Sequence, residues 1–429
     1  MNEPHGVTQP PRHGTATDRH RPGPTRDGGA ADPGGGAVRY GPPAPEPGLP
    51  VLGDLADALA GAARLAHGEP PGGGPVLREA ACGYWTRRGL RSVPDQVVAA
   101  PGPQPLLSAV LAAHGGDVLM PRPCPAWWTP QARLLGRPAY HVPTPAESGG
   151  VPDPYALLET VRRVRAEGGE PRLLLLSVAD DPTATVPPPE LVREACEAAV
   201  AEGLHIVSDE TWRDTLHRPH ETVLVSPAEM CPGDVTVLAD LTGALLPSSW
   251  PVAVARFPVG AAAVRDRVLD LLTALGGFVA EPLAVAAARA LDEPPSIAAR
   301  ISGAAALHAT LATAVHTVVT AAGALARPPR AGRHLYADLG PLRPGLARRG
   351  VSDSMDLEEY LSARLGAPAP GGHRFGDELG ALRVRLATAY LLGPSPETRA
   401  LSLTAPDPLA LPHTADALSR LTAALAELG

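Results

Sequence analysis

The spacing of apolar and polar positions changes several times along this chain of 429 residues. Val51, Leu55 and Leu59 fall on one face of a predicted amphipathic helix, because side chains three and four positions apart lie side by side on a helix. A second helix is predicted from Pro75, since proline suits a first helical turn. Beyond it, short apolar runs alternate with helical segments. These runs predict buried strands at 97–98, 117–120, 139–142, 173–176, 204–208, 235–239 and 252–255.

Strands that alternate with helices in this way are typical of an α/β fold, with a mostly parallel central sheet sandwiched by helices. From about Ala261 the pattern is largely helical, with strand-like stretches at 333–338 and 382–386. We therefore predict an N-terminal arm and large domain over 48–260, then linking helices and a small C-terminal α+β domain over 261–429. Ligands bind beyond the carboxyl ends of strands in such sheets. Those ends correspond to 101–105, 121–128, 178–184, 209–212 and 240–251.

Composition sets a further segment apart and limits the class of protein. Residues 1–47 are rich in Pro, Gly, Arg, His and Asp with little to bury, which predicts a disordered tail. The net charge of −8 argues against a nucleic-acid partner. Four cysteines without CxxC spacing, and no signal-peptide pattern, predict reduced thiols in a cytoplasmic protein. The uncharged stretch 301–326 consists largely of Ala, Thr and Gly, so we expect a packed helix rather than a membrane span.

The chain contains no lysine, and all 37 of its Lys and Arg residues are arginine. Lysine is normally among the commonest residues. A genome poor in A/T-rich codons explains a scarcity of lysine more readily than its complete absence. Whatever the cause, the absence excludes any mechanism that needs a lysine nucleophile or Schiff base from this chain.

Six short stretches, in one order from about residue 48 to the C-terminus, resemble the motifs of a known family. That family is the class I and II aminotransferases, fold-type-I enzymes that depend on pyridoxal phosphate. The stretches resemble its YGxPxG…LR, TPGSQ, NNPTG, SDEIY, SFSK and PGxxFG motifs. They are HGEPPG with VLRE in 67–79, APGPQ at 100–104, DDPTA at 180–184, SDETW at 208–212, DLTG at 240–243 and PGGHRFG at 370–376.

The resemblance places the family's catalytic lysine at a glycine. In the family that lysine holds the cofactor aldehyde as an aldimine. The matching position here is Gly243, and no other lysine exists in the chain to replace it. The resemblance therefore predicts a degenerate member with no catalytic residue and no covalently bound cofactor; pyridoxal phosphate is implied by resemblance only.

The resemblance also implies where the cofactor phosphate would bind, and that subsite is altered. Backbone N–H groups at a helix start, hydroxyls and an arginine usually hold a phosphate. Here Pro103 and Pro105 remove two N–H donors from the loop, an aspartate replaces a serine, and a proline replaces the arginine. The cofactor-phosphate positions are Gly102, Pro103, Gln104, Asp240 and Pro251.

Positions that would surround the cofactor ring differ from the family as well. Trp127 and Trp128 lie close to one of them in the sequence and offer a substitute aromatic. The replacements are Cys124 for the aromatic that stacks on the pyridine, Asp181 for the asparagine at the ring hydroxyl, Trp212 for the tyrosine that shares that contact, and His67 for the tyrosine that reaches in from the neighbouring subunit.

Two positions keep the family's residue. Asp209 matches the aspartate that pairs with the pyridine nitrogen, and Arg383 matches the arginine that holds a substrate carboxylate, with Arg385 as an alternative. From the residues alone, Asp209 could equally cap the next loop, and Arg383 could be an ion-paired strand residue. His217 and His220 have a spacing seen in metal sites, but an intervening proline and the lack of a nearby cysteine favour a surface loop, and we predict no metal site.

The acidic replacements suggest one further hypothesis. If Asp181, Asp209 and Asp240 face one former cofactor cavity, their like charges would favour a divalent cation or an amine. The alternative that we favour is a cavity that has collapsed around Trp212 and Trp250, with the aspartates facing solvent.

Together these observations predict an aminotransferase-like pseudoenzyme that has kept the scaffold and lost Schiff-base chemistry. Because family members form dimers, we expect a homodimer, or a heterodimer with an active paralogue, in which this chain is a regulatory or assembly partner. One alternative is an enzyme of the family that uses non-covalently bound cofactor. Another is a sensor that binds a small molecule or cation in the cleft, since one scaffold can host many functions.

Overall fold

The structure is a computed structural model that describes residues 46–65, 68–145 and 148–428. The predicted tail over 1–47 therefore lies outside the described residues, apart from Glu46 and Pro47. His67, the position matched to the neighbouring subunit's tyrosine, also lies outside them.

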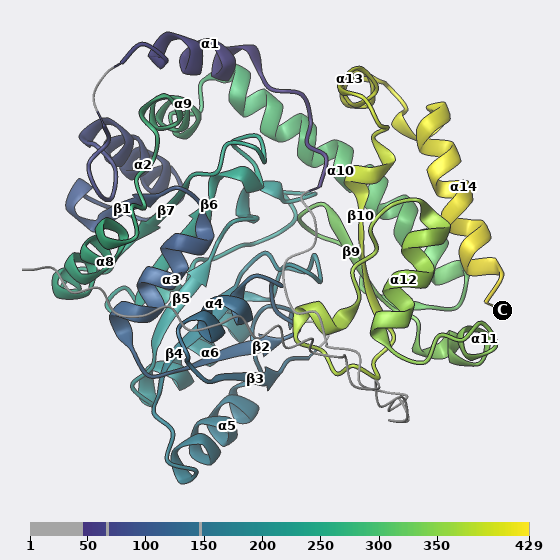
Figure 1. The fold of residues 1–429 in the computed structure, drawn as a ribbon, viewed down its shortest axis with the longest axis horizontal. Coiled ribbons are helices and arrows are strands. Elements are labelled where there is room, and N and C mark those ends of the chain that lie inside the picture. Colours follow the sequence, from purple (N-terminus) through teal and green to yellow (C-terminus); the bar gives the residue numbers. More distant parts are fainter. Residues whose placement is uncertain (1–45, 66–67, 146–147, 429) are drawn as a thin grey trace, which may run out of the picture. The chain divides into compact units, whose positions relative to one another are not determined.

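A seven-stranded sheet forms the centre of the large domain (Figure 1). The strand order is β1-β7-β6-β5-β4-β2-β3; β7 is antiparallel to both neighbours, and the other pairs are parallel. This confirms the predicted mostly parallel α/β sheet. The strands are β1 Val97–Ala100, β2 Asp117–Arg122, β3 Ala139–Pro143, β4 Pro171–Ser177, β5 His205–Asp209, β6 Val235–Asp240 and β7 Ala253–Arg256.

One strand extends past its predicted end. The pattern predicted that β2 stops before Pro121, but the strand continues to Arg122. Its pairing with β4 ends at Leu119, so from Pro121 onward it pairs only with β3. A proline, which lacks an N–H donor, is tolerated where one side of the strand is free of the ladder.

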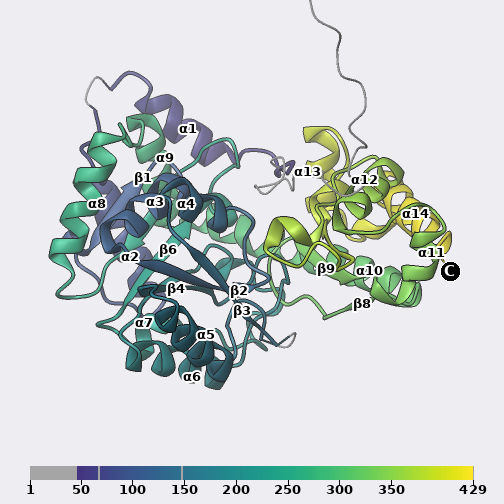
Figure 2. The ribbon, with the colours of Figure 1, turned by 60° about the horizontal axis from the view of Figure 1, so that its bottom comes forward.

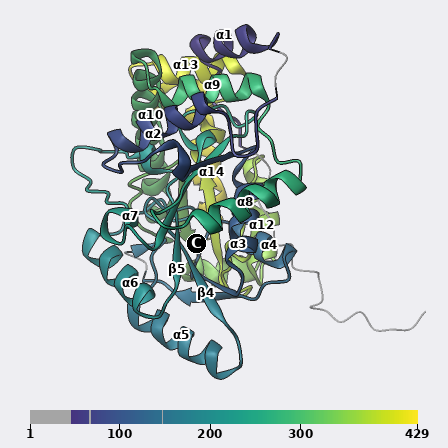
Figure 3. The same cartoon turned by 90° about the vertical axis from the view of Figure 1, so that its left-hand side faces the viewer.

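Helices cover both faces of this sheet, with α3, α4 and α8 on one side and α5, α6 and α7 on the other (Figure 3). Leu106, Trp128 and Leu272 belong to the apolar core on the first side, and Leu157 and Val192 to the core on the second. The helices are α1 Gly53–Ala62, α2 Pro75–Arg87, α3 Pro103–His114, α4 Trp128–Leu134, α5 Pro154–Ala166, α6 Pro189–Ala201, α7 Pro227–Met230, α8 Ala262–Ala274 and α9 Glu281–Leu291.

The C-terminal part forms a smaller α+β domain with its own apolar core, which includes Leu311, Leu357 and Val384 (Figure 2). The helix α10 (Pro295–Ala321) leads into it, whereas α8 and α9, predicted as linking helices, pack on α3 and on α1 and α2. An antiparallel sheet in the order β10-β9-β8 carries the domain. Its elements are β8 Leu325–Ala326, β9 His334–Asp338, β10 Arg383–Ala387, α11 Arg343–Ala347, α12 Ser354–Leu365, α13 Pro396–Thr404 and α14 Pro412–Ala426.

Among the described residues, α10 is the one helix long and apolar enough to cross a membrane by length and composition. Its side chains Leu311, Val315 and Val319 pack in the core of the small domain. His308 is buried in the same helix, with Nδ1 2.8 Å from Oγ1 of Thr388. These contacts agree with the prediction of a packed helix.

Candidate functional site

Most of the positions matched by motif lie at one edge of the large sheet. Asp209 ends β5 and Asp240 ends β6, while Cys124 and Asp181 follow β2 and β4. These strands run in the same direction, so their carboxyl ends meet at a common edge, where α/β sheets bind ligands. The small sheet faces this edge, because Arg385 of β10 bonds to Asp181. The candidate site is therefore the cleft between the two sheets.

Asp209 is buried and is already bonded to groups of the protein. Its Oδ1 accepts the backbone N–H of Thr211 at 3.0 Å, and its Oδ2 accepts the indole N–H of Trp128 at 3.3 Å. Burial raises the pKa of Asp209 to about 6, although both hydrogen bonds act in the opposite direction. The carboxylate thus caps the next loop, as one of the two interpretations expected. The indole N–H also provides the kind of donor that a protonated ring nitrogen would offer.

The raised pKa of Asp209 predicts a particular dependence of stability on pH. Since aspartate in an unfolded chain has a pKa of about 4, the folded state binds the extra proton between about pH 4 and 6. Stability should therefore fall as pH rises through that window. We expect the difference in free energy of unfolding between the wild type and Asp209→Asn to change by on the order of 2–3 kcal/mol from pH 4 to pH 7.

This difference can be measured by urea denaturation of both proteins at each pH. The wild type should lose stability relative to the variant as the pH rises. The exposed Asp270→Asn serves as a control and should follow the wild type at both pH values. Parallel curves for the wild type and Asp209→Asn would contradict the assignment of the slope to Asp209.

Gly243 lies where the chain has no room for a side chain. It ends a short 3-10 helix, Leu241–Gly243, which Asp240 caps by accepting the N–H and hydroxyl of Thr242 at 3.0 and 2.8 Å. A Cβ added to Gly243 would collide with the backbone carbonyl oxygen of Thr211 and would lie 2.8 Å from its Cγ2. Arg333 donates to the carbonyl of Gly243 at 2.5 Å. The position matched to a lysine is therefore filled by the neighbouring loop.

Two of the positions matched to the phosphate subsite, Gly102 and Pro251, are neighbours in the structure. Gly102 precedes α3 with a φ of 116°, and Pro103 is the first residue of that helix. A Cβ added to Gly102 would lie 3.5 Å from Cβ of Pro251, so these two positions are neighbours. Gln104 and Pro251 are exposed, whereas Gly102 and Pro103 are buried. The helix start thus presents proline instead of an N–H donor at its first position.

Cys124 and Trp212, two of the positions matched to ring contacts, are held by other parts of the protein. Cys124 is buried, its Sγ lies 3.8 Å from Sδ of Met120, and burial raises the pKa of the thiol. Its backbone N–H donates to the carbonyl of Phe375 in the small domain at 2.9 Å. Trp212 meets the ring of His334 edge to face, with centroids 5.1 Å apart.

Asp181 is ion-paired with the small domain. Both of its carboxylate oxygens accept from Nη1 of Arg385, at 2.7 and 2.9 Å. The other terminal nitrogen of Arg385 donates to Glu46 at 2.8 Å, and Nε2 of His334 lies 3.1 Å from the same Glu46 oxygen. Burial opposes ionisation of Glu46, but the charges of His334 and Arg385 outweigh it and hold its pKa at about 2. Glu46 therefore belongs to the cleft although composition assigned it to the tail.

The hypothesis that three aspartates share one anionic pocket is wrong for this structure. Asp181 is neutralised by Arg385, while Asp209 and Asp240 bond to Trp128 and to loop residues. Among the described residues, no group of three or more His, Cys, Asp or Glu side chains is arranged to hold a metal ion. The alternative of aspartates that face solvent also fails for Asp181 and Asp209, which are buried.

Arg383, matched to the substrate arginine, is ion-paired within the small domain. Its Nε lies 3.1 Å from Asp338 and its Nη1 3.0 Å from Asp377. It borders a cavity of about 750 Å³ that Arg122 and Tyr336 also line. Arg383 is thus an ion-paired strand residue, as one of its two interpretations expected. Arg385, the alternative match to the substrate arginine, lies against Asp181. A substrate-binding role for either arginine stays a prediction.

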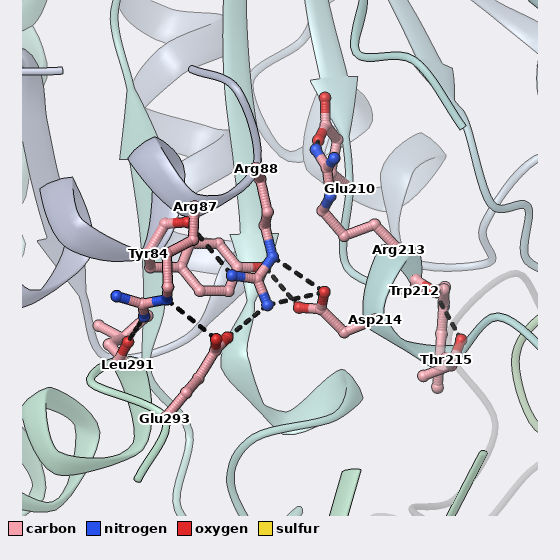
Figure 4. Close-up of polar contacts among 10 residues, drawn as sticks. All are labelled: Tyr84, Arg87, Arg88, Glu210, Trp212, Arg213, Asp214, Thr215, Leu291 and Glu293. Carbon is pink, nitrogen blue, oxygen red and sulfur yellow. Dashed lines mark hydrogen bonds and ion pairs between the residues drawn. The ribbon is translucent and has the colours of Figure 1, made fainter. Parts of the chain in front are cut away.

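An ion-pair cluster fixes the segment that follows Asp209 (Figure 4). Asp214 accepts the hydroxyl of Tyr84 at 2.7 Å and Nε of Arg88 at 2.9 Å. Arg88 also pairs with Glu293, and its guanidinium lies 3.6 Å from the centroid of the Tyr84 ring. Arg213 pairs with Glu210 in the same segment. These contacts tie the loop of Thr211 and Trp212 to α2 and so hold Thr211 against Gly243.

His217 and His220, the two histidines with metal-like spacing, differ in their surroundings. His217 has its two ring nitrogens 3.2 and 3.0 Å from the carbonyl oxygens of Pro329 and Gly332. His220 is exposed. This agrees with the surface-loop interpretation of His220, and it gives His217 a structural role that the spacing did not suggest.

Several residues of the cleft were not singled out from the sequence. Thr211 lies inside the matched stretch 208–212, but nothing there indicates that its carbonyl abuts Gly243. Arg333 and His334 begin a predicted strand, whose alternation alone does not say which ligand or partner they face. Glu46 carried no local signal, because its partner on β10 is 339 positions away.

The strand order, the reversed β7 and the small domain that faces the carboxyl edge define the fold-type-I aminotransferase architecture. Residues 53–387 match the family described as aminotransferase class I and II. The chain therefore belongs to the aminotransferase class I and II family. For this chain, pyridoxal phosphate is implied only by its resemblance to that family.

Individual relatives agree with this assignment. A probable aspartate/prephenate aminotransferase of Thermus aquaticus is 30% identical over 207 residues, 46% of this chain and 52% of that relative. The aspartate/prephenate aminotransferase of Thermus thermophilus is 28% identical over 193 residues, 44% of this chain and 48% of that relative. The match thus spans about half the length of these curated relatives.

Solved structures show the same fold over most of the chain. The aspartate aminotransferase from Thermus thermophilus with maleate superposes with a TM-score of 0.72 at 21% identity, covering 88% of this chain and 90% of that one. The N-succinyldiaminopimelate aminotransferase from Mycobacterium tuberculosis gives a TM-score of 0.71 at 21% identity, covering 90% and 93%.

Proposed function

We propose that this chain is a pseudoenzyme of the aminotransferase class I and II family, which forms no aldimine with pyridoxal phosphate and acts as a regulatory or assembly partner in the cytoplasm. One observation carries the proposal: at Gly243 the carbonyl of Thr211 fills the space in which any side chain would begin. With no lysine in the sequence, the chain also has no amine elsewhere on a side chain to replace it.

The other residues of the cleft do not fit the cofactor either. Asp240 would set a negative charge against a phosphate, and Pro103 provides no N–H at the start of α3. Asp209 already accepts the indole N–H of Trp128 and the backbone N–H of Thr211, so its carboxylate does not depend on a pyridine nitrogen for a hydrogen-bond donor.

The proposal predicts that purified protein does not bind pyridoxal phosphate. Titration should give the absorbance spectrum of the free cofactor and no heat of binding above that of dilution. A lysine-bearing family member, treated in parallel, should shift the spectrum as its aldimine forms. Stoichiometric binding that survives gel filtration, or turnover of amino and keto acids, would contradict the proposal.

The partner role would use the edge of the large sheet. Val76, Val259 and Leu275 are 70, 81 and 65% exposed. Val76 lies in α2, Val259 follows β7 and Leu275 follows α8, and these three elements contact the edge strand β1. If these side chains form one apolar surface, a protein partner would cover it. We propose a homodimer, or a heterodimer with an active paralogue, through this edge.

Sedimentation should test this assembly. Leu275→Asp is expected to shift the protein toward the monomer, because an unpaired charge would be buried in the interface. Leu401→Asp, at an apolar side chain on α13 that is 50% exposed, is the matched control and should leave the mass unchanged. Equal masses for all three proteins would contradict an interface at this edge.

A second candidate, a ligand-binding or sensor role, is favoured by the contacts of Arg385. Its guanidinium binds the carboxylate of Glu46 from another part of the chain, which supports a place for a carboxylate at that point.

A further inference from the structure

A pocket of about 450 Å³ opens in the small domain, where α10, α13 and α14 lie close to the end of β10 (Figure 1). Of the described residues that line it, none is an arginine of β10. Leu386 lines the pocket and follows Arg385 along the strand, so the two side chains lie on opposite faces of β10. Because Arg385 bonds to Asp181, its face is the one that borders the cleft. The pocket is therefore a separate cavity.

Most of the pocket lining is apolar. Val315 of α10, Leu391 and Leu421 of α14 belong to the core of the small domain and also line the pocket. Leu365 and Leu418 pack against this core and complete the apolar surface. Pockets of about 300–1,000 Å³ with apolar walls and a few polar groups are typical of sites for small organic molecules. The size and the lining thus fit a ligand with an apolar body.

Three charged side chains border the pocket, and together they leave one positive charge. Arg420 and Asp416 form an exposed ion pair, so their charges largely cancel. Arg399 of α13 forms no ion pair within the described ranges. Hydrogen bonding to Ser395, and to a lesser degree the charge of Arg399, lower the pKa of Glu397, but that carboxylate is exposed to water. Water screens such a charge, so the pocket keeps a preference for an anion.

Arg399 also has a hydrogen-bond donor to spare. Its Nη1 donates to the carbonyl of Pro394 at 3.3 Å, whereas its Nε is buried and has no partner in the described part of the chain. A buried donor without a partner costs free energy, and a bound acceptor would remove that cost. A carboxylate is a strong acceptor for arginine, because the hydrogen bond is then charge-assisted. The lining and the free donor together specify an apolar chain with one anionic head.

We propose that this pocket binds a fatty acid of medium chain length, with the alkyl chain among Leu391, Leu418 and Leu421 and the carboxylate at Arg399. Burial of the alkyl chain supplies affinity, and Arg399 supplies the preference for an acid over an alcohol. The inference goes beyond the proposed partner role. It does not depend on the loss of aldimine chemistry, because the residues that bind the fatty acid are not those matched to the cofactor.

Octanoate is the probe, and calorimetry measures its affinity for the protein. We expect octanoate to bind about tenfold more tightly than hexanoate, because two further methylene groups leave water. Octan-1-ol has the same chain without the charge and should bind more weakly than octanoate. Saturating octanoate should also slow hydrogen exchange in peptides that span 386–394 and 413–421, which places the ligand in this pocket.

Two variants separate the charge from the cavity. Arg399→Gln is expected to lower the affinity for octanoate about tenfold and to leave that for octan-1-ol unchanged, a difference that a general loss of structure would not produce. Ala417→Phe on α14 should weaken the binding of both probes, because its ring would fill part of the pocket. Arg172→Gln, at an exposed arginine of β4, is the matched control and should behave like the wild type.

Several results would overturn the proposal. They are the lack of saturable octanoate binding, equal octanoate affinity of the wild type and Arg399→Gln, and undiminished binding of both probes by Ala417→Phe. A protein that lacks residues 1–44 should bind octanoate like the wild type, and tighter binding would identify the segment next to Pro47 as the occupant instead. Affinity that falls as protein concentration rises would point to a second copy. Binding of pyridoxal phosphate would contradict only the proposed loss of catalysis.

Discussion

A lysine introduced at Gly243 is expected to destabilise the protein by about 3 kcal/mol without creating an aldimine. The new Cβ would meet the carbonyl oxygen of Thr211, an atom of the main chain, so no change of rotamer relieves the contact. The surrounding loop is held by the Asp214 and Arg213 ion pairs and resists a shift. Urea denaturation and titration with pyridoxal phosphate measure the two parts of this prediction.

Gly61→Lys is the matched control. It also introduces a single lysine, but at an exposed position of α1 where a Cβ has open space. We expect it to keep or slightly raise the stability, because glycine is about 1 kcal/mol less favourable than other residues inside a helix. Thr211→Gly should not rescue Gly243→Lys, since the obstructing oxygen remains. A stable Gly243→Lys protein that forms an aldimine would show that the site can still open.

Replacing Arg385 by methionine is expected to cost about 3–5 kcal/mol of stability, because it leaves the buried carboxylate of Asp181 without its partner. Glu46 would lose the same guanidinium. Adding Asp181→Asn to Arg385→Met should recover part of this loss, as the uncompensated charge is then gone. Urea denaturation at neutral pH, followed by circular dichroism, measures both effects.

Arg420→Met provides the comparison for this variant. Arg420 pairs with Asp416 on the surface of α14, where both side chains are about half exposed. Such pairs contribute less than about 1 kcal/mol, so little change is expected. If Arg385→Met were no more destabilised than Arg420→Met, the cluster around Arg385 would not be a significant determinant of stability.

The fold was largely predictable from the sequence, because its signals are local. Apolar runs such as Leu173–Leu176 identified the strands, and prolines such as Pro75 and Pro189 mark the first residues of α2 and α6. The family motifs follow the strands, so Asp209 and Asp240 were correctly placed at strand ends. Parallel strands then bring those ends to one edge of the sheet without further information.

The contents of the cleft were less predictable, because they depend on partners far apart in the chain. Asp181 and Arg385 are 204 positions apart, and alternation along β10 does not distinguish Arg385 from Arg383. One hypothesis placed the three aspartates in a shared pocket and the favoured alternative placed them in solvent, but Asp181 bonds to Arg385, Asp209 to Trp128 and Asp240 to Thr242 of its own loop. Composition assigned Glu46 to a tail because it describes a segment by its average, whereas one ion pair is enough to anchor a residue.

The reversed direction of β7 has a consequence for how this family can vary. Because β7 is antiparallel to β6, the connection between Asp240 and Ala253 leaves and re-enters the sheet at the same edge. No helix has to cross a face of the sheet between them, unlike the connections between parallel strands. Asp240, Gly243 and Pro251 all lie in or beside this connection. Its chemistry can therefore be exchanged as a unit while strand order and both helix layers persist, which makes loss or gain of an activity a local event in an unchanged scaffold.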